Sequence, residues 1–245
     1  DNTFNPKGGV KRAEVAAMFS RTLDYLEDHD GMPTLAQYDG VEKFKGVLLD
    51  ASADTVTLRS MEGVEYILDL DRDVEITADG KSVSKMSSSY EDSYAELYFD
   101  KDEKTITRAV IDTKSDWIQG QLKTSDTTAL SIVDPDDNST KSYLFDKEET
   151  KFYYEDKSIP KTSLARGSFV TVKMGEKRLE QVWAYPGEYE LEGTMVSMDY
   201  GTTCTVVAED EDGAKFQISF SISDQPKISR GGITYDDGLT RLQEG

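Results

Sequence analysis

Apolar and polar positions alternate along most of the chain after residue 40. Short segments rich in β-branched and aromatic residues, such as "TVTLRS" at 55–60 and "AELYFD" at 95–100, show this period of two. Turn-forming clusters of Asp, Gly, Asn and Lys lie between these segments, as in "DKDEK" at 100–104. The pattern predicts a mainly β protein. The segments "SKMSSSYEDSY" at 84–94 and "PKTSLARG" at 160–167 are expected to be connections with one helical turn each.

One segment near the start has the helical period instead. Side chains that form a single stripe recur three and four positions apart, at Val15, Met18, Phe19, Thr22, Leu23 and Leu26. Gly9 precedes the stripe and Gly31 follows it, which are positions typical of helix ends. We expect one N-terminal amphipathic helix with a packing partner, because a lone helix of about four turns is marginal in water.

The β region is self-similar at a constant interval. The segments "FKGVLLD", "IQGQLKT" and "LEGTMVSMD" place Gly46, Gly120 and Gly193 at intervals of 74 and 73 residues. Further landmarks keep nearly the same spacing: Leu58 with Ile132 and Val206, Leu97 with Val170, Ile106 with Leu179, and the aromatic residues Tyr66, Tyr143 and Phe216. Self-similarity of this kind indicates repeated structural units. About six short strands per unit predict small β-barrels, closed or nearly closed.

These two patterns define the expected domain organisation. It comprises a helical segment at 1–27, a linker at 28–40, and three β units at 41–114, 115–187 and 188–245. The third unit stops before any match to the closing hairpin of the second unit, so we expect it to be incomplete. Its edge would then be open, filled by a neighbouring molecule, or supplied by strands from another part of the chain.

Charge restricts the classes of partner. The 245 residues include 28 Lys and Arg against 48 Asp and Glu, for a formal net charge of −20. An acidic chain repels nucleic-acid phosphates and anionic membrane surfaces. No apolar run in the sequence reaches the ~18 residues that a membrane-spanning helix needs. We therefore expect no nucleic-acid partner and no membrane insertion.

Candidates for chemistry are few. His29 is the only histidine and Cys204 the only cysteine, which argues against His-based catalysis and Cys-based metal clusters. Cys204 lies in an alternating apolar run and is expected to be a buried strand thiol. The acidic clusters at 134–138 and 210–212 carry oxygen ligands of the kind that Ca²⁺ takes. Both fall where hairpin turns are expected, so we predict turns, no catalytic residues and no cofactor, with Ca²⁺ as the alternative.

The segment "FNPKGGVKRAEVAAMFSRTL" at 4–23 resembles the second half of an S-layer homology motif. The matching positions are Phe4, Pro6, Val10, Arg12, Ala13, Glu14, Ala16, Phe19, Arg21 and Leu23. In that family, three motifs build a domain that anchors surface proteins to cell-wall polysaccharide. The resemblance covers about a tenth of the chain and lacks the first helix of the motif. Residues 1–27 therefore resemble the tail of a last repeat.

The resemblance also implies binding residues. The family's T-R-A-E arginine lies at the polysaccharide groove, which assigns cell-wall glycan binding to Arg12, with Lys11 and Glu14 beside it. Lys11 stands where the family has Thr, and Lys cannot accept the N-cap hydrogen bond that Thr accepts. The other interpretation of Arg12 is an ion pair with Glu14. Binding of the secondary cell-wall polysaccharide is expected through the intact S-layer homology domain.

Two functional hypotheses remain. In the first, the chain is part of a secreted, non-enzymatic bacterial surface protein in the S-layer or cell wall. Its β units would act as structural or stalk modules, with self-association between copies. In the second, the small barrels form a carbohydrate- or peptide-binding module on the cell surface. Glycan binding by residues 41–245 would favour the second hypothesis, and inertness toward ligands would favour the first.

Overall fold

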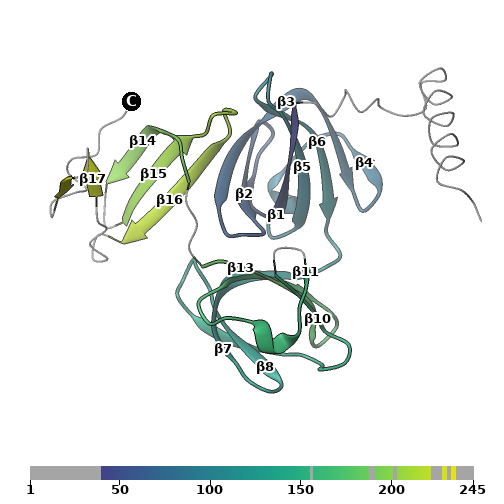
Figure 1. Ribbon diagram of the computed structural model, residues 1–245. Coiled ribbons are helices and arrows are strands. Elements are labelled where there is room, and N and C mark those ends of the chain that lie inside the picture. Colours follow the sequence, from purple (N-terminus) through teal and green to yellow (C-terminus); the bar gives the residue numbers. More distant parts are fainter. Residues whose placement is uncertain are drawn as a thin grey trace, which may run out of the picture. The chain divides into compact units, whose positions relative to one another are not determined.

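The computed structural model describes residues 40–154, 157–187, 191–200, 203–221, 228–230 and 233–235. The predicted helix at 1–27, the linker up to residue 39 and the proposed glycan-binding residues Lys11, Arg12 and Glu14 lie outside these residues. The chain divides into two compact units, Asp1–Val41 and Glu42–Gly245, and the structure below is that of the second. This part is mainly β, as predicted, and Figure 1 shows its strands.

A small closed barrel occupies the start of the described region. Its strands are β1 (Val41–Ala51), β2 (Thr55–Ser60), β3 (Glu65–Ala78), β5 (Tyr94–Asp100) and β6 (Thr105–Asp112), and β4 (Lys81–Val83) pairs with the end of β3. The order β3-β2-β1-β5-β6 closes because β6 returns to β3 in parallel. The long strand β3 makes this closure possible, since its first half pairs with β2 and its second half with β6.

The barrel interior follows from the period of two. On β5, Ala95, Leu97 and Phe99 are buried and alternate with partly exposed residues. The connection after β4 contains the short 3-10 helix η2 (Ser88–Tyr90), as expected, and Met86 beside it is 2% exposed. The buried core contains Phe44, Leu48, Ala51, Val56, Leu58, Leu68, Leu70, Ile76, Met86, Ala95, Leu97, Phe99, Ile106, Ala109, Ile111 and Ala214.

A second sheet of seven strands follows in the chain. Its strands are β7 (Trp117–Ser125), β8 (Ala129–Val133), β9 (Thr140–Leu144), β10 (Lys151–Tyr154), β11 (Lys157–Ser158), β12 (Phe169–Met174) and β13 (Leu179–Tyr185), in the order β11-β10-β13-β12-β7-β8-β9. A single parallel bridge from Phe145 to Leu179 connects the end of β9 with β13. The expected helical turn in the 160–167 connection is the 3-10 helix η3 (Lys161–Ser163).

The third group of strands is a meander attached to the barrel. It consists of β14 (Thr194–Tyr200), β15 (Thr203–Glu209) and β16 (Lys215–Ser221), while β17 (Ile228–Arg230) and β18 (Ile233–Tyr235) form a separate hairpin. β16 pairs with β3, with Phe216 opposite Tyr66. One edge of the meander is thus paired with a strand from residues 41–114. Cys204 on β15 is 0% exposed, as predicted, and its burial raises the pKa of the thiol.

The strand registers agree with some of the sequence landmarks. In the β1–β2 pair, Leu48 lies opposite Leu58, and the register shifts before Asp50. In the β7–β8 pair, Leu122 lies opposite Ile132, and the register shifts before Thr124. The two ladders therefore run in step at an interval of 74 residues, the interval between Gly46 and Gly120.

Other landmark matches were wrong by two residues. Met195 lies opposite Ala208 just before the same irregularity, so Ala208, not Val206, takes the position of Ile132. Likewise Leu97 lies opposite Ala109 and Val172 opposite Val182, so Val172, not Val170, is the counterpart of Leu97. Hairpin lengths differ between the units, so the number of residues between matching positions is not constant. Because side chains alternate with period two, a shift of two keeps each side chain on the same face.

The match between Tyr66 and Tyr143 was wrong for the same reason. Tyr66 lies opposite Leu58, whereas Tyr143 lies opposite Leu130 rather than opposite Ile132. Phe216 does keep the position of Tyr66, since it lies opposite Ala208. Tyr66 packs on the barrel core and also contacts the small cluster around Phe216, so it serves as packing in both places.

Candidate functional site: the polar joint around Arg59

The turn between β2 and β3, residues 60–64, brings two charged residues face to face. The Ser60 N–H donates to Val64 O at 2.7 Å, and the Val64 N–H donates to Ser60 Oγ at 3.1 Å. Gly63 has a φ of +95°, a left-handed conformation that favours glycine. The turn sets Arg59, on β2, opposite Glu65, on β3.

Arg59 is almost completely buried although it lies on an outer face of the barrel. Its residue exposure is 5%, and its guanidinium contacts two carboxylates. Nε and Nη2 donate to Glu65 Oε1 at 3.0 and 2.7 Å, while Nη1 and Nη2 donate to Asp136 Oδ2 and Oδ1 at 3.2 and 2.5 Å. Burial alone would lower the pKa of Arg59, but the hydrogen bonds to Asp136 and Glu65 outweigh it and raise the pKa.

Asp136 comes from the hairpin turn between β8 and β9, in the second sheet. Asp134 Oδ1 accepts the Asp136 N–H at 3.0 Å, Asp137 Oδ1 accepts the Ser139 N–H at 2.7 Å, and Asn138 has a φ of +57°. Hydrogen bonds from Ser139 lower the pKa of Asp137. The acidic cluster at 134–138 is thus a turn, as predicted. Among the described residues, no group of three or more His, Cys, Asp or Glu is placed to hold a metal ion.

Side chains of the second sheet also bind the backbone of the 60–64 turn. The Gln119 amide Nε2, on β7, donates to the carbonyl oxygens of Arg59 and Ser60 at 3.2 and 2.9 Å. Thr171 Oγ1, on β12, donates to the carbonyl oxygen of Met61 at 2.9 Å and accepts from Gln119 Nε2 at 3.1 Å. Gln119 and Thr171 are 8% and 0% exposed, so these bonds satisfy backbone carbonyls in a buried contact.

Apolar contacts surround these hydrogen bonds. A Cβ atom at Gly63 would lie 2.8 Å from the ring of Phe169, on β12. Tyr94, on β5, stacks on Trp117, on β7, with ring centroids 4.4 Å apart. The stack continues within the second sheet from Trp117 to Trp183 at 5.6 Å and from Trp183 to Tyr153 at 5.5 Å. We call this set of contacts, polar and apolar, the joint.

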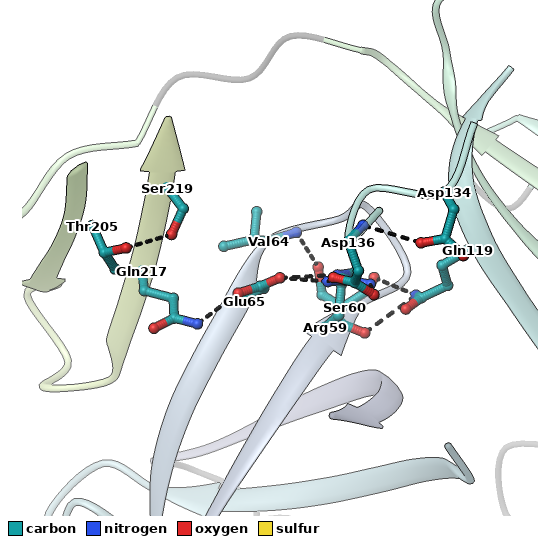
Figure 2. Close-up of polar contacts among 10 residues, drawn as sticks. All are labelled: Arg59, Ser60, Val64, Glu65, Gln119, Asp134, Asp136, Thr205, Gln217 and Ser219. Carbon is teal, nitrogen blue, oxygen red and sulfur yellow. Dashed lines mark hydrogen bonds and ion pairs between the residues drawn. The ribbon is translucent and has the colours of Figure 1, made fainter. Parts of the chain in front are cut away.

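The meander connects to the joint through Glu65. Gln217 Nε2, on β16, donates to Glu65 Oε2 at 2.6 Å, while Oε1 of the same carboxylate is bound by Arg59. Figure 2 shows Glu65 lying between Gln217 and Arg59, with Asp136 on the far side of the guanidinium. Glu65 therefore links three groups of strands.

Two lysines of the β5–β6 turn reach the β15–β16 hairpin. Lys101 Nζ lies 2.7 Å from Asp212, and Lys104 Nζ lies 3.2 Å from Glu209. The second acidic cluster, at 210–212, forms this hairpin, since Asp210 Oδ1 accepts the Asp212 and Ala214 N–H groups at 3.0 and 2.9 Å. It is a turn, as predicted.

Sequence reasoning singled out Asp136 as a candidate Ca²⁺ ligand but did not identify Arg59, Glu65 or Gln119. Arg59 occupies a polar position of an alternating strand, which is normally solvent-exposed. No local signal indicates that a turn 77 residues away covers it.

The fold and the joint define a mainly β protein in which a closed barrel, a second sheet and a meander are connected by buried polar contacts. Comparison with protein-family models and with curated protein sequences gives no match to this chain. In the part of the chain that the structure describes, no helix has the length and apolar character required to cross a membrane.

Proposed function

We propose that this chain is part of a non-enzymatic bacterial cell-surface protein, located outside the cell in the S-layer or cell wall. Its β units act as structural or stalk modules, and copies of the protein self-associate. The resemblance of residues 4–23 to an S-layer homology motif supports the location. The observation that supports the mechanical role is the joint, where Arg59 is buried and shared by Glu65 and Asp136.

The joint supports a stalk because it opposes bending between the barrel and the second sheet. A tilt of either part would separate Arg59 from Asp136 and uncover backbone carbonyls that Gln119 now satisfies, each at a cost of about 1–3 kcal/mol. The connection between β6 and β7, residues 113–116, is short and itself fixed. Thr113 Oγ1 donates to Asp79 Oδ2 at 2.9 Å, and Ser115 Oγ donates to Asp112 Oδ2 at 2.7 Å.

We further infer that the three β units are tandem repeats of about 74 residues, at 41–114, 115–187 and 188–245. Support comes from the glycines that set the repeat interval. A Cβ at Gly46 would lie 2.0 Å from the Arg59 carbonyl oxygen, and one at Gly120 would lie 2.2 Å from that of Val133. At Gly193 it would lie 2.8 Å from that of Glu209. The same constraint therefore requires glycine at all three positions, because the facing strand approaches too closely for a side chain.

The proposed partner is the secondary cell-wall polysaccharide, bound through an intact S-layer homology domain in which Arg12, Lys11 and Glu14 contribute. The proposal gives the β units neither a catalytic role nor a cofactor. It is tested by immunogold labelling of cells that make the full gene product. Label on the outer face of the wall, lost when the wall polysaccharide is chemically removed, is the expected result. Label in the cytoplasm, or retention by stripped walls, would contradict the proposal.

The second candidate function is a carbohydrate- or peptide-binding module. One observation favours it, an open cavity of about 250 Å³ beside the joint, lined among others by Trp117, Gln119 and Tyr143.

A further inference from the structure

One edge of β14 is unpaired in the part of the chain that the structure describes. β14 ends the order of its sheet and pairs there with β15 alone (Figure 1). The strands at the matching repeat position are paired on both sides, since β1 lies between β2 and β5, and β7 lies between β8 and β12. Exposure agrees with this difference, because Gly46 and Gly120 are buried whereas Gly193 is exposed. The third group of strands therefore presents an edge that the first two units cover.

The same two backbone hydrogen bonds fix the covering strand in each of the first two units. The N–H and C=O of Leu48 bond to residues 92–93, directly before β5, at 3.0 and 2.8 Å. The N–H and C=O of Leu122 bond in the same way to residues 167–168, directly before β12, both at 2.8 Å. Met195 takes the position of these leucines in the β14–β15 ladder, and none of the described residues makes the corresponding pair of bonds with it. The register of a missing strand is thus defined.

The sequence of β14 does not prevent pairing at this edge. Edge strands are commonly protected by Lys, by Pro or by a bulge. β14 contains no Lys, Arg or Pro, whereas β9, an edge strand of the second sheet, contains Lys141. The register irregularity at Val196 is not a protection, because β1 and β7 have it at the matching position and are still paired on both edges. The side chain of Val196 is 39% exposed, which adds apolar surface at this edge.

An antiparallel hairpin covers the matching edge in each of the first two units. β5 pairs with β6, and β12 pairs with β13. The covering strand buries every second side chain, at Ala95, Leu97 and Phe99 on β5 and at Val170 and Val172 on β12. The chain itself therefore shows which partner chemistry fits the edge. It is a strand with apolar side chains at alternate positions that returns as the second arm of a hairpin.

We propose that the free edge of β14 binds a polypeptide β-hairpin of the same kind as β12–β13. The first strand of the hairpin extends the sheet and makes the two backbone hydrogen bonds with Met195. It places an apolar residue opposite Gly193, as Val170 lies opposite Gly120. Strand addition of this kind takes its affinity from main-chain hydrogen bonds and its specificity from the alternate side chains. The inference rests on the repeat equivalence proposed above and is independent of the cellular location.

The test is hydrogen exchange by ¹H–¹⁵N NMR on the full chain, with and without a synthetic peptide of residues 167–185. In the free chain, the Met195 amide should exchange faster than the amides of Leu48 and Leu122, because its edge is open. At a peptide concentration about ten times the Kd, exchange at Met195 should slow about tenfold. Protection of Met195 in the free chain equal to that of Leu48 would overturn the proposal. So would the absence of any effect at a peptide concentration of about 1 mM.

A control peptide and a matched pair of variants sharpen the test. The control peptide carries Val170→Asp and Val172→Asp at two buried positions of the covering strand, and it should leave the Met195 amide unprotected. Met195→Pro removes the N–H on the open side and should abolish binding in isothermal titration calorimetry, whereas Met195→Ala keeps that N–H and should still bind. Unchanged exchange of the β15 amides would confirm that both variants are folded.

Equal protection by the two peptides, or equal affinity of the two variants, would overturn the proposal. Protection of Met195 that rises with protein concentration without peptide, together with a dimer in sedimentation equilibrium, would assign the edge to a second copy and overturn it as well. If the peptide fails while Gly46→Ala and Gly120→Ala destabilise the chain alike, the repeat proposal stands and the docking proposal alone is wrong.

Discussion

Arg59 and Asp136, 77 residues apart in the chain, form a two-pronged ion pair in which both Nη atoms reach the two carboxylate oxygens, at 3.2 and 2.5 Å. The pair is asymmetric, because the Arg59 side chain is 6% exposed and that of Asp136 is 66% exposed. The guanidinium is thus held inside the joint, with Glu65 as its second partner, while Asp136 covers it from the solvent side. A planar fork matches this geometry and an ammonium group does not.

Removal of Arg59 should cost more than removal of the charge of Asp136. Arg59→Met leaves the Glu65 carboxylate without its cation, and we expect a loss of about 2–3 kcal/mol in the free energy of unfolding. Asp136→Asn should cost about 1 kcal/mol or less, because the carboxylate is largely exposed and Glu65 still pairs with Arg59. Urea unfolding followed by tryptophan fluorescence measures both. As a control, Arg178→Met breaks an exposed pair with Asp146 and should cost less than about 0.5 kcal/mol. Equal losses for Arg59→Met and Arg178→Met would contradict the buried role of Arg59.

Gly63 is constrained both by its backbone and by the neighbouring sheet. Gly63→Ala would place a Cβ 2.8 Å from Phe169 at a φ of +95°, so we expect a loss of about 2–3 kcal/mol. Gly80 provides the control, since its φ is +77° but nothing lies within 4 Å of its Cβ position. Gly80→Ala should cost only the backbone strain, about 1 kcal/mol. Thermal unfolding of the two variants compares them, and identical shifts would argue against contact between the turn and β12.

The repeat glycines should respond alike. Gly46→Ala and Gly120→Ala each place a Cβ within about 2 Å of a facing carbonyl oxygen, so the paired strands must move apart. We expect losses of about 2–4 kcal/mol for both. Gly175→Ala is the control, since its Cβ would lie 3.3 Å from the nearest atom, the Arg178 carbonyl oxygen. It should cost less than about 1 kcal/mol, which is less than either repeat variant. Denaturant unfolding curves measure the loss in the free energy of unfolding for each variant. If one of the two variants were as stable as the parent while the other unfolded the chain, the repeat proposal would be contradicted.

Glu42 gives a pH dependence of known sign. Burial raises its pKa, Lys101 opposes this, and Asp210 and Asp212 raise the pKa further, with the net result above the ordinary value. The folded chain therefore holds the Glu42 proton more tightly than the unfolded chain. Stability from this group is present below its ordinary pKa and is lost as pH rises through the raised folded pKa. Glu42→Gln should stabilise the protein slightly at pH 7 and flatten the rise in stability that the parent shows as pH falls toward the ordinary pKa of a glutamate. Denaturant unfolding at pH 4, 5 and 7 measures this, and a variant less stable than the parent at pH 7 would contradict it.

Local patterns in the sequence predicted the local structure well. The alternation at Leu97 and Phe99 identified inward-facing positions, and the acidic clusters were recognised as turns because Asp134 and Asp210 bind their own turn backbones. Constant spacing failed where the count passes through hairpins of unequal length, as at Val206 and Val170. A constant interval counts residues along the chain, whereas equivalent positions in two ladders are set by the hydrogen-bonded pairing of their strands.

The joint could not be predicted by the same means. An outward Arg on an alternating strand is indistinguishable from a solvated one until the second sheet covers it. Gln119 and Thr171 likewise occupy outward positions, and their burial depends on contact with the 60–64 turn. Contacts between surfaces far apart in sequence leave no periodicity, and a single sequence therefore contains no direct signal for them.

The most direct test of a rigid joint is the measurement of amide residual dipolar couplings for the full chain in a weakly aligning medium. Couplings from strands of the barrel, within 41–112, and from strands of the second sheet, within 117–185, are fitted separately. A rigid joint predicts alignment tensors of equal magnitude and orientation for the two sets, with divergence in the Arg59→Met variant. Two tensors of clearly different magnitude in the unmodified chain would show independent motion and contradict the structural role proposed here.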